Sequence, residues 1–218
     1  MMLLLLIKLN KEEDCENMSA FITALKKRRS IYHLGENISL SNKEVEELVK
    51  EVVRETPTSF NSQTQRVVIL FGDAHKKLWN MTEDALKPLT PAENFPGTQE
   101  KLQGFAAGKG TILFFEDMDV VKGLQEQFAL YAENFPIWSE QASGMTQANV
   151  WVALSENNIG ANLQHYNPVI DDAVAAEWEI PASWKLRGQM VFGSIETPAG
   201  EKEYAADEFS ERNIQNFI

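Results

Sequence analysis

Two groups of basic residues, far apart in the sequence, have the side chains of an anion-binding site. Residues 26–30 read Lys-Lys-Arg-Arg-Ser, and Lys185 and Arg187 form a Lys-x-Arg pair toward the other end. Arginine forms forked, charge-assisted hydrogen bonds with phosphate oxygens, and a serine hydroxyl is a further donor. If both groups close on one ligand, that ligand is expected to carry a phosphate.

Each basic group also has an ordinary structural interpretation. Cations at residues 26–29 would stabilise a helix C-terminus through the helix dipole. Lys185 and Arg187 would project to the same side of a strand, which is equally typical of a half-exposed strand. A phosphate ligand and a solvated surface therefore both stay open for each group taken alone.

A polar segment lies between the two basic groups. Residues 57–63 read Pro-Thr-Ser-Phe-Asn-Ser-Gln, which combines a rigid start with hydroxyls and amides. These neutral groups suit a ligand whose edge alternates hydrogen-bond donors and acceptors. The alternative is a simple connection between a helix and a strand.

The overall charge limits the partners that the protein can have. The 218 residues include 20 Lys and Arg against 32 Asp and Glu, which gives a formal net charge of −12. Such a charge repels nucleic acids and anionic membrane surfaces, so we expect no nucleic acid and no membrane as partners. Cys15 is the only cysteine, which excludes an intrachain disulfide, and we expect a cytoplasmic protein.

Capping residues and apolar spacing predict three of the helices. Ser19 can cap a helix that runs into the basic residues, and Ser41 with Glu44 forms a capping box for a helix that ends before Pro57. Pro136 begins a long helix that Gly160 would end, and we expect it to be the central buried helix. The residues expected near one of its faces are Ile137, Gln141, Met145, Ala148 and Val152.

The remaining elements follow from apolar runs and from breaking residues. Strands are expected at residues 67–71, 111–115 and 186–195, and shorter helices from residue 73 and at residues 102–107, 120–131 and 171–178. Three prolines and a glycine predict a surface loop at residues 88–97. Because strands are few and widely spaced among helices, the expected fold class is α+β.

The chain is expected to form one domain over residues 18–218. Residues 1–17, which begin with a short apolar run, read as an extension or flexible N-terminal arm, or alternatively as an edge strand or a partner-clasping arm. The acidic stretch 196–211 reads as a solvated tail. The three histidines, His33, His75 and His165, lack the spacing of metal ligands, so we expect no metal site.

Taken together, the basic groups and the polar segment resemble the motifs of the nitroreductase family of flavin enzymes. In that family an Arg-Arg-Ser-like motif follows the first helix, a Pro-Ser-Ser-x-Asn-Ser-Gln-like loop follows the second, and a Lys-x-Arg pair lies on a late strand. Here the matching residues are 28–30, 57–63 and 185–187, and the resemblance covers about residues 18–195. Residues 28–32, 110–117 and 160–168 are most similar to a compact subgroup, the fatty-acid-repression-mutant type.

The resemblance implies a nitroreductase-like fold with a mixed, mostly antiparallel sheet flanked by helices, and a homodimer that binds FMN. The residues it implies for the phosphate and ribityl chain are Arg28, Arg29, Ser30, Lys185 and Arg187. Those it implies from the other subunit are Pro57, Thr58, Ser59 and Asn61, and Gln63 and Tyr32 are also expected to bind the cofactor. The residues it implies along the flavin ring are Leu163, Gln164 and His165.

The resemblance also implies an activity. NADH or NADPH would reduce the FMN, and a nitroaromatic, quinone or similar flat acceptor would then be reduced in a ping-pong cycle without a catalytic acid or base. Tyr32 stands where many relatives carry a cation, so Lys185 is the candidate to neighbour the pyrimidine edge of the ring. The alternative is a flavin-binding regulatory protein with little turnover that responds to redox state or lipids.

Overall fold

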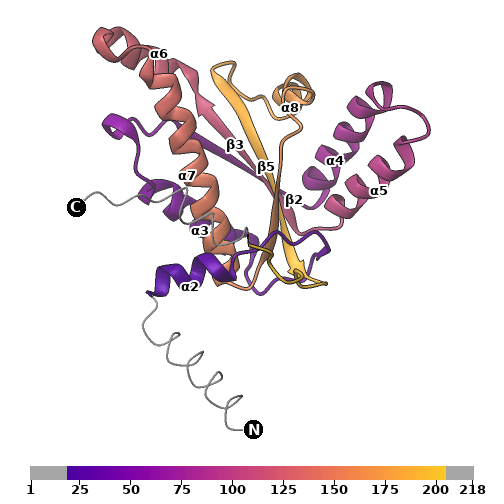
Figure 1. The fold of residues 1–218 in the computed structure, drawn as a ribbon. Helices are drawn as coiled ribbons and strands as arrows, with labels where there is room; N and C mark the ends of the chain where they lie inside the picture. The colour runs from indigo at the N-terminus through magenta and orange to yellow at the C-terminus, as the bar shows by residue number, and fades with distance from the viewer. Residues whose placement is uncertain (1–18, 205–218) are drawn as a thin grey trace, which may run out of the picture.

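A sheet with helices on both faces makes up residues 19–204, the part of the chain that this computed structural model describes (Figure 1). The helices on one face are α2 (Ala20–Lys27), α3 (Asn42–Glu55) and α7 (Asn134–Glu156). Those on the other face are α4 (Gly72–Leu86), α5 (Phe95–Ala106) and α8 (Asp171–Glu177). The expected α+β class is confirmed, whereas the arm expected at residues 1–17 lies outside the described residues.

The sheet is antiparallel throughout its named strands. Its members are β1 (Leu34–Gly35), β2 (Gln65–Phe71), β3 (Gly110–Asp117), β4 (Gly160–Gln164) and β5 (Trp184–Ile195). The order is β1-β5-β3-β2, and β4 also pairs with β5. β5 therefore hydrogen-bonds with three other strands, while β2 lies at an edge of the sheet.

The central strand β3 shows how the two faces of the sheet are packed. Ile112 and Phe114 join one hydrophobic cluster with α3 and α7, whereas Leu113 and Phe115 join another with α4, α5 and α8. Successive side chains of a strand point to opposite faces, so a strand buried on both faces reads as a continuous apolar run. This run is the reason why the sequence located β3 correctly.

Several predicted helix ends are confirmed. The Ser19 hydroxyl accepts from the backbone N–H of Ile22 at the start of α2, and Ser41 and Glu44 form the expected capping box of α3. α3 ends at Glu55, and its C-cap Thr56 directly precedes Pro57. These ends were predictable because caps and proline act through neighbouring residues alone.

Other expectations about the elements are corrected. α5 begins at Phe95, inside the predicted loop at residues 88–97, because proline is tolerated in the first turn of a helix. The predicted helix at 120–131 is broken at Phe128 into α6 (Met118–Gln127) and the 3-10 helix η3 (Ala129–Tyr131). The polar strand β4 and the two-residue β1 were not predicted, because neither carries a run of β-branched residues.

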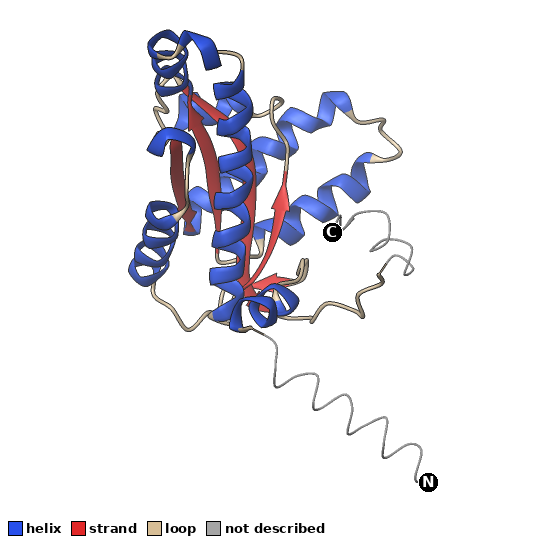
Figure 2. Cartoon of the chain, turned by 60° about the vertical axis from the view of Figure 1, so that its left-hand side comes forward, coloured by secondary structure: helices blue, strands red, loops and turns tan. Residues whose placement is uncertain are grey.

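The long helix α7 buries a different face from the one predicted. Figure 2 shows it lying along one face of the sheet, and its buried residues include Ser139, Ser143 and Thr146. On the predicted face, Ile137 and Met145 are 55% and 42% exposed in the single chain. The apolar pattern therefore located a surface stripe, defined here as Ile137, Gln141, Met145, Ala148 and Val152. None of the helices within residues 19–204 is both long and apolar enough to cross a membrane.

Candidate functional site

The first basic group is held between α2 and β4. Arg28 is the C-cap of α2, and its N–H donates to the Ala24 carbonyl oxygen at 3.0 Å. The next residues run beside β4, where the Ile31 N–H donates to the Ala161 carbonyl at 2.9 Å. The Asn162 side chain then donates to the Ile31 carbonyl at 2.8 Å. The backbone of this segment is therefore fixed at both ends.

The end of β5 returns to the same place. β1 pairs with this end, and the His33 ring lies 3.2 Å from the Thr197 hydroxyl. The two segments enclose a cavity of about 540 Å³. Its lining residues are Arg28, Arg29, Ser30, Ile31, Tyr32, His33, Thr197, Pro198, Ala199, Gly200 and Lys202. Three of these are cations and none of these described lining residues is acidic, so the cavity suits an anion.

The Arg29 guanidinium is the most informative group in this cavity. Arg29 is partly buried, and within residues 19–204 its guanidinium forms no hydrogen bond or ion pair. In a protein with a net charge of −12, carboxylates are plentiful, yet none is placed against it. An unpaired, partly buried cation is costly unless a ligand provides the counter-charge. The cavity therefore has the electrostatics of an anion site.

Lys202 is a cavity residue that the sequence did not reveal. It lies between Glu201 and Glu203 in the stretch that was expected to be a solvated acidic tail. Only the pairing of β1 with the end of β5 brings residues 197–202 over Arg28 and Arg29. No local sequence pattern could predict that residues 197–202 lie close to Arg28 and Arg29, because their position depends on contacts between residues more than 160 positions apart.

The second basic group lies elsewhere in the single chain. Phe114 is opposite Gly188 and Phe115 is opposite Leu186, so Arg187 occupies a β-bulge without a partner residue on β3. Arg187 forms an ion pair with Glu140 on α7, and its Nε is buried without a hydrogen-bond partner among residues 19–204. Lys185 is exposed. Neither residue lines the cavity that contains Arg28 and Arg29.

The polar segment forms a strained turn before β2. It contains the 3-10 helix η1 (Ser59–Asn61), and three non-glycine residues have positive φ: Phe60 at 57°, Asn61 at 51° and Gln63 at 47°. The Gln63 N–H donates to the Thr58 hydroxyl at 3.1 Å. Such backbone conformations cost free energy and cluster at functional sites. Pro57, Thr58, Ser59, Asn61 and Gln63 are thus together, but not in the cavity with Arg29.

Aromatic rings hold this turn against the start of α7. The ring centroid of Phe60 lies 4.9 Å from that of Phe128 and 5.3 Å from that of Phe135, and its ring stacks on Trp138 at 6.1 Å. Phe60 is still 52% exposed. The turn therefore presents an aromatic surface beside its polar groups.

The residues predicted to line the flavin ring lie at the end of β4. Leu163 is opposite Met190 and Gln164 is opposite Gln189, and His165 follows the strand. The Gln164 side chain donates to Asn162 at 2.9 Å, and Asn162 in turn donates to Ile31, the residue after Ser30. β4 therefore links the expected ring-binding residues to the anion cavity through the same strand.

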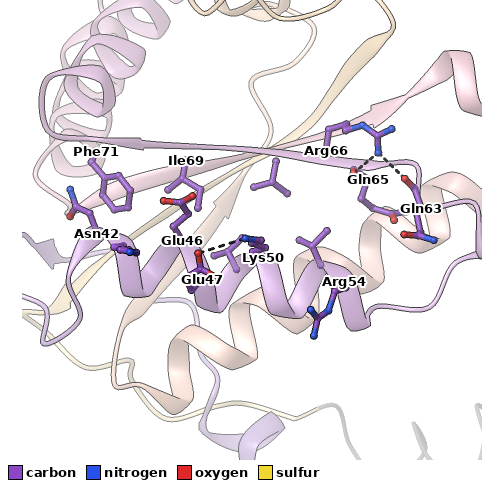
Figure 3. Close-up of a pocket in the computed structure, with 14 residues that line it drawn as sticks. Asn42, Glu46, Glu47, Lys50, Arg54, Gln63, Gln65, Arg66, Ile69 and Phe71 are labelled. Carbon is purple, nitrogen blue, oxygen red and sulfur yellow. Dashed lines mark hydrogen bonds and ion pairs between the residues drawn. The ribbon is translucent and has the colours of Figure 1, made fainter.

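A larger groove lies between α3 and β2 (Figure 3). It has a volume of about 1030 Å³ and an apolar floor that includes Val49, Val67 and Ile69. Of the predicted site residues only Gln63 lines it, and its carbonyl accepts from Arg66 at 2.7 Å. Its rim mixes acidic and basic residues, so it lacks the single sign of charge that the cavity around Arg29 has.

A buried carboxyl group lies under the strained turn. Glu116 on β3 is fully buried, and the Ser139 hydroxyl donates to its Oε2 at 3.0 Å. Burial raises the pKa of Glu116 above its ordinary value of 4.5, and the nearby charge of Glu140 raises it further. Hydrogen bonds from Thr64, Ser139 and Gln65 oppose this shift.

Within the described residues, no group of three or more His, Cys, Asp or Glu side chains could hold a metal ion.

Comparisons with known proteins extend over nearly all of the described chain. The model of the nitroreductase family matches residues 25–194. The protein HBN1 of Saccharomyces cerevisiae is 38% identical over 192 residues, which is 86% of this chain and 95% of HBN1. The nitroreductase CinD from Lactococcus lactis, solved with chloramphenicol, is 56% identical with a TM-score of 0.82, over 91% of this chain and 100% of that one. A nitroreductase with bound FMN from Desulfitobacterium hafniense shares the fold at 13% identity, with a TM-score of 0.67 over 92% and 100% of the two chains.

Replacing Glu116 by Gln is expected to change how stability depends on pH. A carboxyl whose pKa is raised by folding is most stabilising when protonated, and this contribution is lost as pH rises through the folded-state pKa. The free energy of unfolding of the wild type should therefore fall more steeply from pH 5 to pH 8 than that of Glu116→Gln. Urea unfolding measures this slope, and Glu126→Gln, which removes an exposed carboxylate, is the control. Equal slopes for the wild type and Glu116→Gln would contradict the shift.

Proposed function

The chain belongs to the nitroreductase family, and on this premise we propose that it is an FMN-dependent oxidoreductase that transfers electrons from NADH or NADPH to flat acceptors. Oxidoreductase activity is the common property of the family. The finer assignments, which are the nicotinamide donor, the ping-pong order and an acceptor such as a nitroaromatic or quinone, are part of the proposal. CinD, with which this chain is 56% identical, has been solved with chloramphenicol and with 4-nitrophenol, which supports a flat aromatic acceptor.

The single observation that carries the cofactor assignment is the unpaired Arg29 in a cavity without acidic residues. A phosphate monoester supplies two negative charges and several acceptor oxygens to guanidinium and hydroxyl donors. Arg28, Arg29, Ser30 and Lys202 would hold the FMN phosphate there. That a structure of this fold carries bound FMN agrees with the assignment.

The other proposed cofactor residues differ in how close they lie to the anion cavity in the single chain. Tyr32 lines the anion cavity, and Leu163, Gln164 and His165 lie on or next to the strand that supports it. Lys185 and Arg187 remain predicted phosphate ligands, although Arg187 is paired with Glu140 in this chain. The ion pair would have to be exchanged before Arg187 could bind a phosphate.

We further propose that the protein is a homodimer built on the surface stripe of α7. Apolar residues of α2 add to this exposed area, since Phe21 is 62% exposed and Leu25 is 39% exposed. Exposed apolar surfaces of this kind mark association sites. In the dimer, Pro57, Thr58, Ser59 and Asn61 of one protomer would approach the flavin that is held by the other.

FMN, when bound, supplies the acceptance and donation of hydride. The residues of this chain bind, orient and shield it. Arg28, Arg29 and Lys202 neutralise the phosphate, and the end of β4 offers backbone groups to the ring. A cation near the pyrimidine edge would stabilise negative charge on the reduced ring, and Lys185 is the candidate for this position.

The purified protein is expected to be yellow and to oxidise NADH or NADPH in the presence of a quinone or nitroaromatic. Steady-state rates at varied donor and acceptor concentrations should give parallel double-reciprocal lines, because the two substrates use one site in turn. The visible spectrum measures the bound flavin, and the steady-state assay measures the rates. Reduction of bound flavin without turnover would instead favour the regulatory alternative, and a colourless protein that ignores added FMN would reject both.

Arg29→Ala and Lys202→Ala are expected to weaken FMN binding, by roughly 2–5 kcal/mol for the arginine if its charge pair is desolvated. Arg187→Ala is the comparison, since Arg187 is the predicted ligand that lies outside the cavity. Fluorescence titration of the apoprotein with FMN measures each dissociation constant. Unchanged affinity in Arg29→Ala would show that the phosphate does not bind in this cavity. A loss of FMN affinity in Arg187→Ala would show that both basic groups bind the phosphate.

Met145→Glu is expected to convert the dimer to a monomer, because it places a charge in the middle of the surface stripe of α7. Glu46→Gln on the exposed face of α3 is the control and should leave the oligomeric state unchanged. Gel filtration with light scattering measures the mass. A dimer that persists in Met145→Glu would place the interface elsewhere.

A further inference from the structure

Arg28 makes a contact that the phosphate assignment does not explain. Its guanidinium carbon lies 4.6 Å from the centroid of the Trp151 ring and over the face of that ring. Trp151 is partly buried on α7, whereas Arg28 closes α2. A cation over an indole face is attracted by the ring quadrupole, and tryptophan provides the strongest such attraction.

The backbone around Arg28 is already fixed by other contacts. Lys27 donates to the Glu156 carbonyl at 3.3 Å and lies 3.4 Å from the Glu156 carboxylate, which ties α2 to the end of α7. On the other side, Ile31 is bonded to β4. The orientation of the long Arg28 side chain is therefore what Trp151 adds.

Stacking leaves the donors of Arg28 available. The indole covers one face of the guanidinium, whereas the N–H groups lie in its plane and can still form a forked pair with phosphate oxygens. Within residues 19–204 no carboxylate forms an ion pair with Arg28. A carboxylate in the place of Trp151 would also fix the side chain, but it would compete with the anion for the same donors.

The indole nitrogen takes no part in this arrangement. Nε1 of Trp151 is buried and has no hydrogen-bond partner among the described residues. The ring face and its packing therefore account for the contact. A phenyl ring at this position would keep a cation–π surface, whereas an aliphatic side chain would not.

We propose that Trp151 is a positioning residue that holds the Arg28 guanidinium toward the anion cavity and thereby sets the preference for a phosphorylated flavin over one without phosphate. This inference rests on the proposed function, since it takes the anion to be the FMN phosphate. Trp151 itself is not among the residues that line the cavity. Because Trp151 already fixes the orientation of the Arg28 side chain, Arg28 loses less conformational entropy when the anion binds.

The test compares two ligands, FMN and riboflavin, which differ only in the phosphate. Dissociation constants for both are measured by flavin fluorescence on the apoprotein of the wild type, Trp151→Leu and Trp151→Phe. We expect Trp151→Leu to bind FMN about 3- to 10-fold more weakly and riboflavin as the wild type does. Trp151→Phe should stay close to the wild type for both ligands. Trp178→Leu, which removes a partly buried tryptophan next to α8, is the matched control and should not change the ratio of the two constants.

The outcomes separate this inference from the proposed function. If the wild type binds FMN and riboflavin equally, the phosphate site fails and the inference with it. If the wild type prefers FMN but Trp151→Leu keeps that preference, or loses affinity for both flavins alike, the site stands and the role of Trp151 is overturned. If Trp151→Phe loses the preference as fully as Trp151→Leu, the cation–π explanation is overturned. Should Trp151→Leu fail to fold, Trp151→Met replaces it as a flexible apolar side chain of closer size.

Discussion

The pairing of β5 with three other strands is the constraint on which the cavity depends. β3 pairs with β5 from Trp184 to Phe192, β4 pairs with it from Gln189 to Gly193, and β1 pairs with its last two residues. The Arg28–Ser30 segment is joined to β4 through Ala161. The basic group near the start of the chain and residues 197–202, which follow β5, therefore line the same cavity. The hydrogen bonds of one strand thus bring together side chains that are about 170 positions apart.

The charge of the lining residues is the basis of the anion site that we propose for this cavity. A protein with 32 acidic residues has left three cations around one cavity without placing a carboxylate among its lining residues. Two other partly buried arginines of the described chain are paired with carboxylates, Arg66 with Asp117 at 3.0 Å and Arg187 with Glu140. The Arg29 guanidinium, by contrast, has no carboxylate partner within residues 19–204, which is why we assign it an anionic ligand.

The two faces of α7 are the basis of the homodimer that we propose. Its buried face contains hydroxyl and amide groups that bond within the fold, such as Ser139 to Glu116 and Gln147 to Ser143. On its surface stripe, Ile137 and Met145 stay exposed within residues 19–204. The strained turn at residues 57–63 and its aromatic neighbours lie near the start of the same helix. A second copy on this stripe would bring that turn toward a cofactor, which is how we interpret its polar groups.

The sequence by itself determined the elements that depend on neighbouring residues. The caps at Ser19 and Ser41, the stop before Pro57 and the apolar run of β3 were all predictable, because their causes lie within a few positions. The basic residues Arg28 and Arg29 and the family resemblance could also be found from composition and order alone. Only the tertiary structure decided which face of α7 is buried, that Arg187 occupies a bulge beside Glu140, and that Lys202 rather than Lys185 lines the cavity. These three outcomes arise from contacts between distant segments, whose free energies no local pattern of residues records.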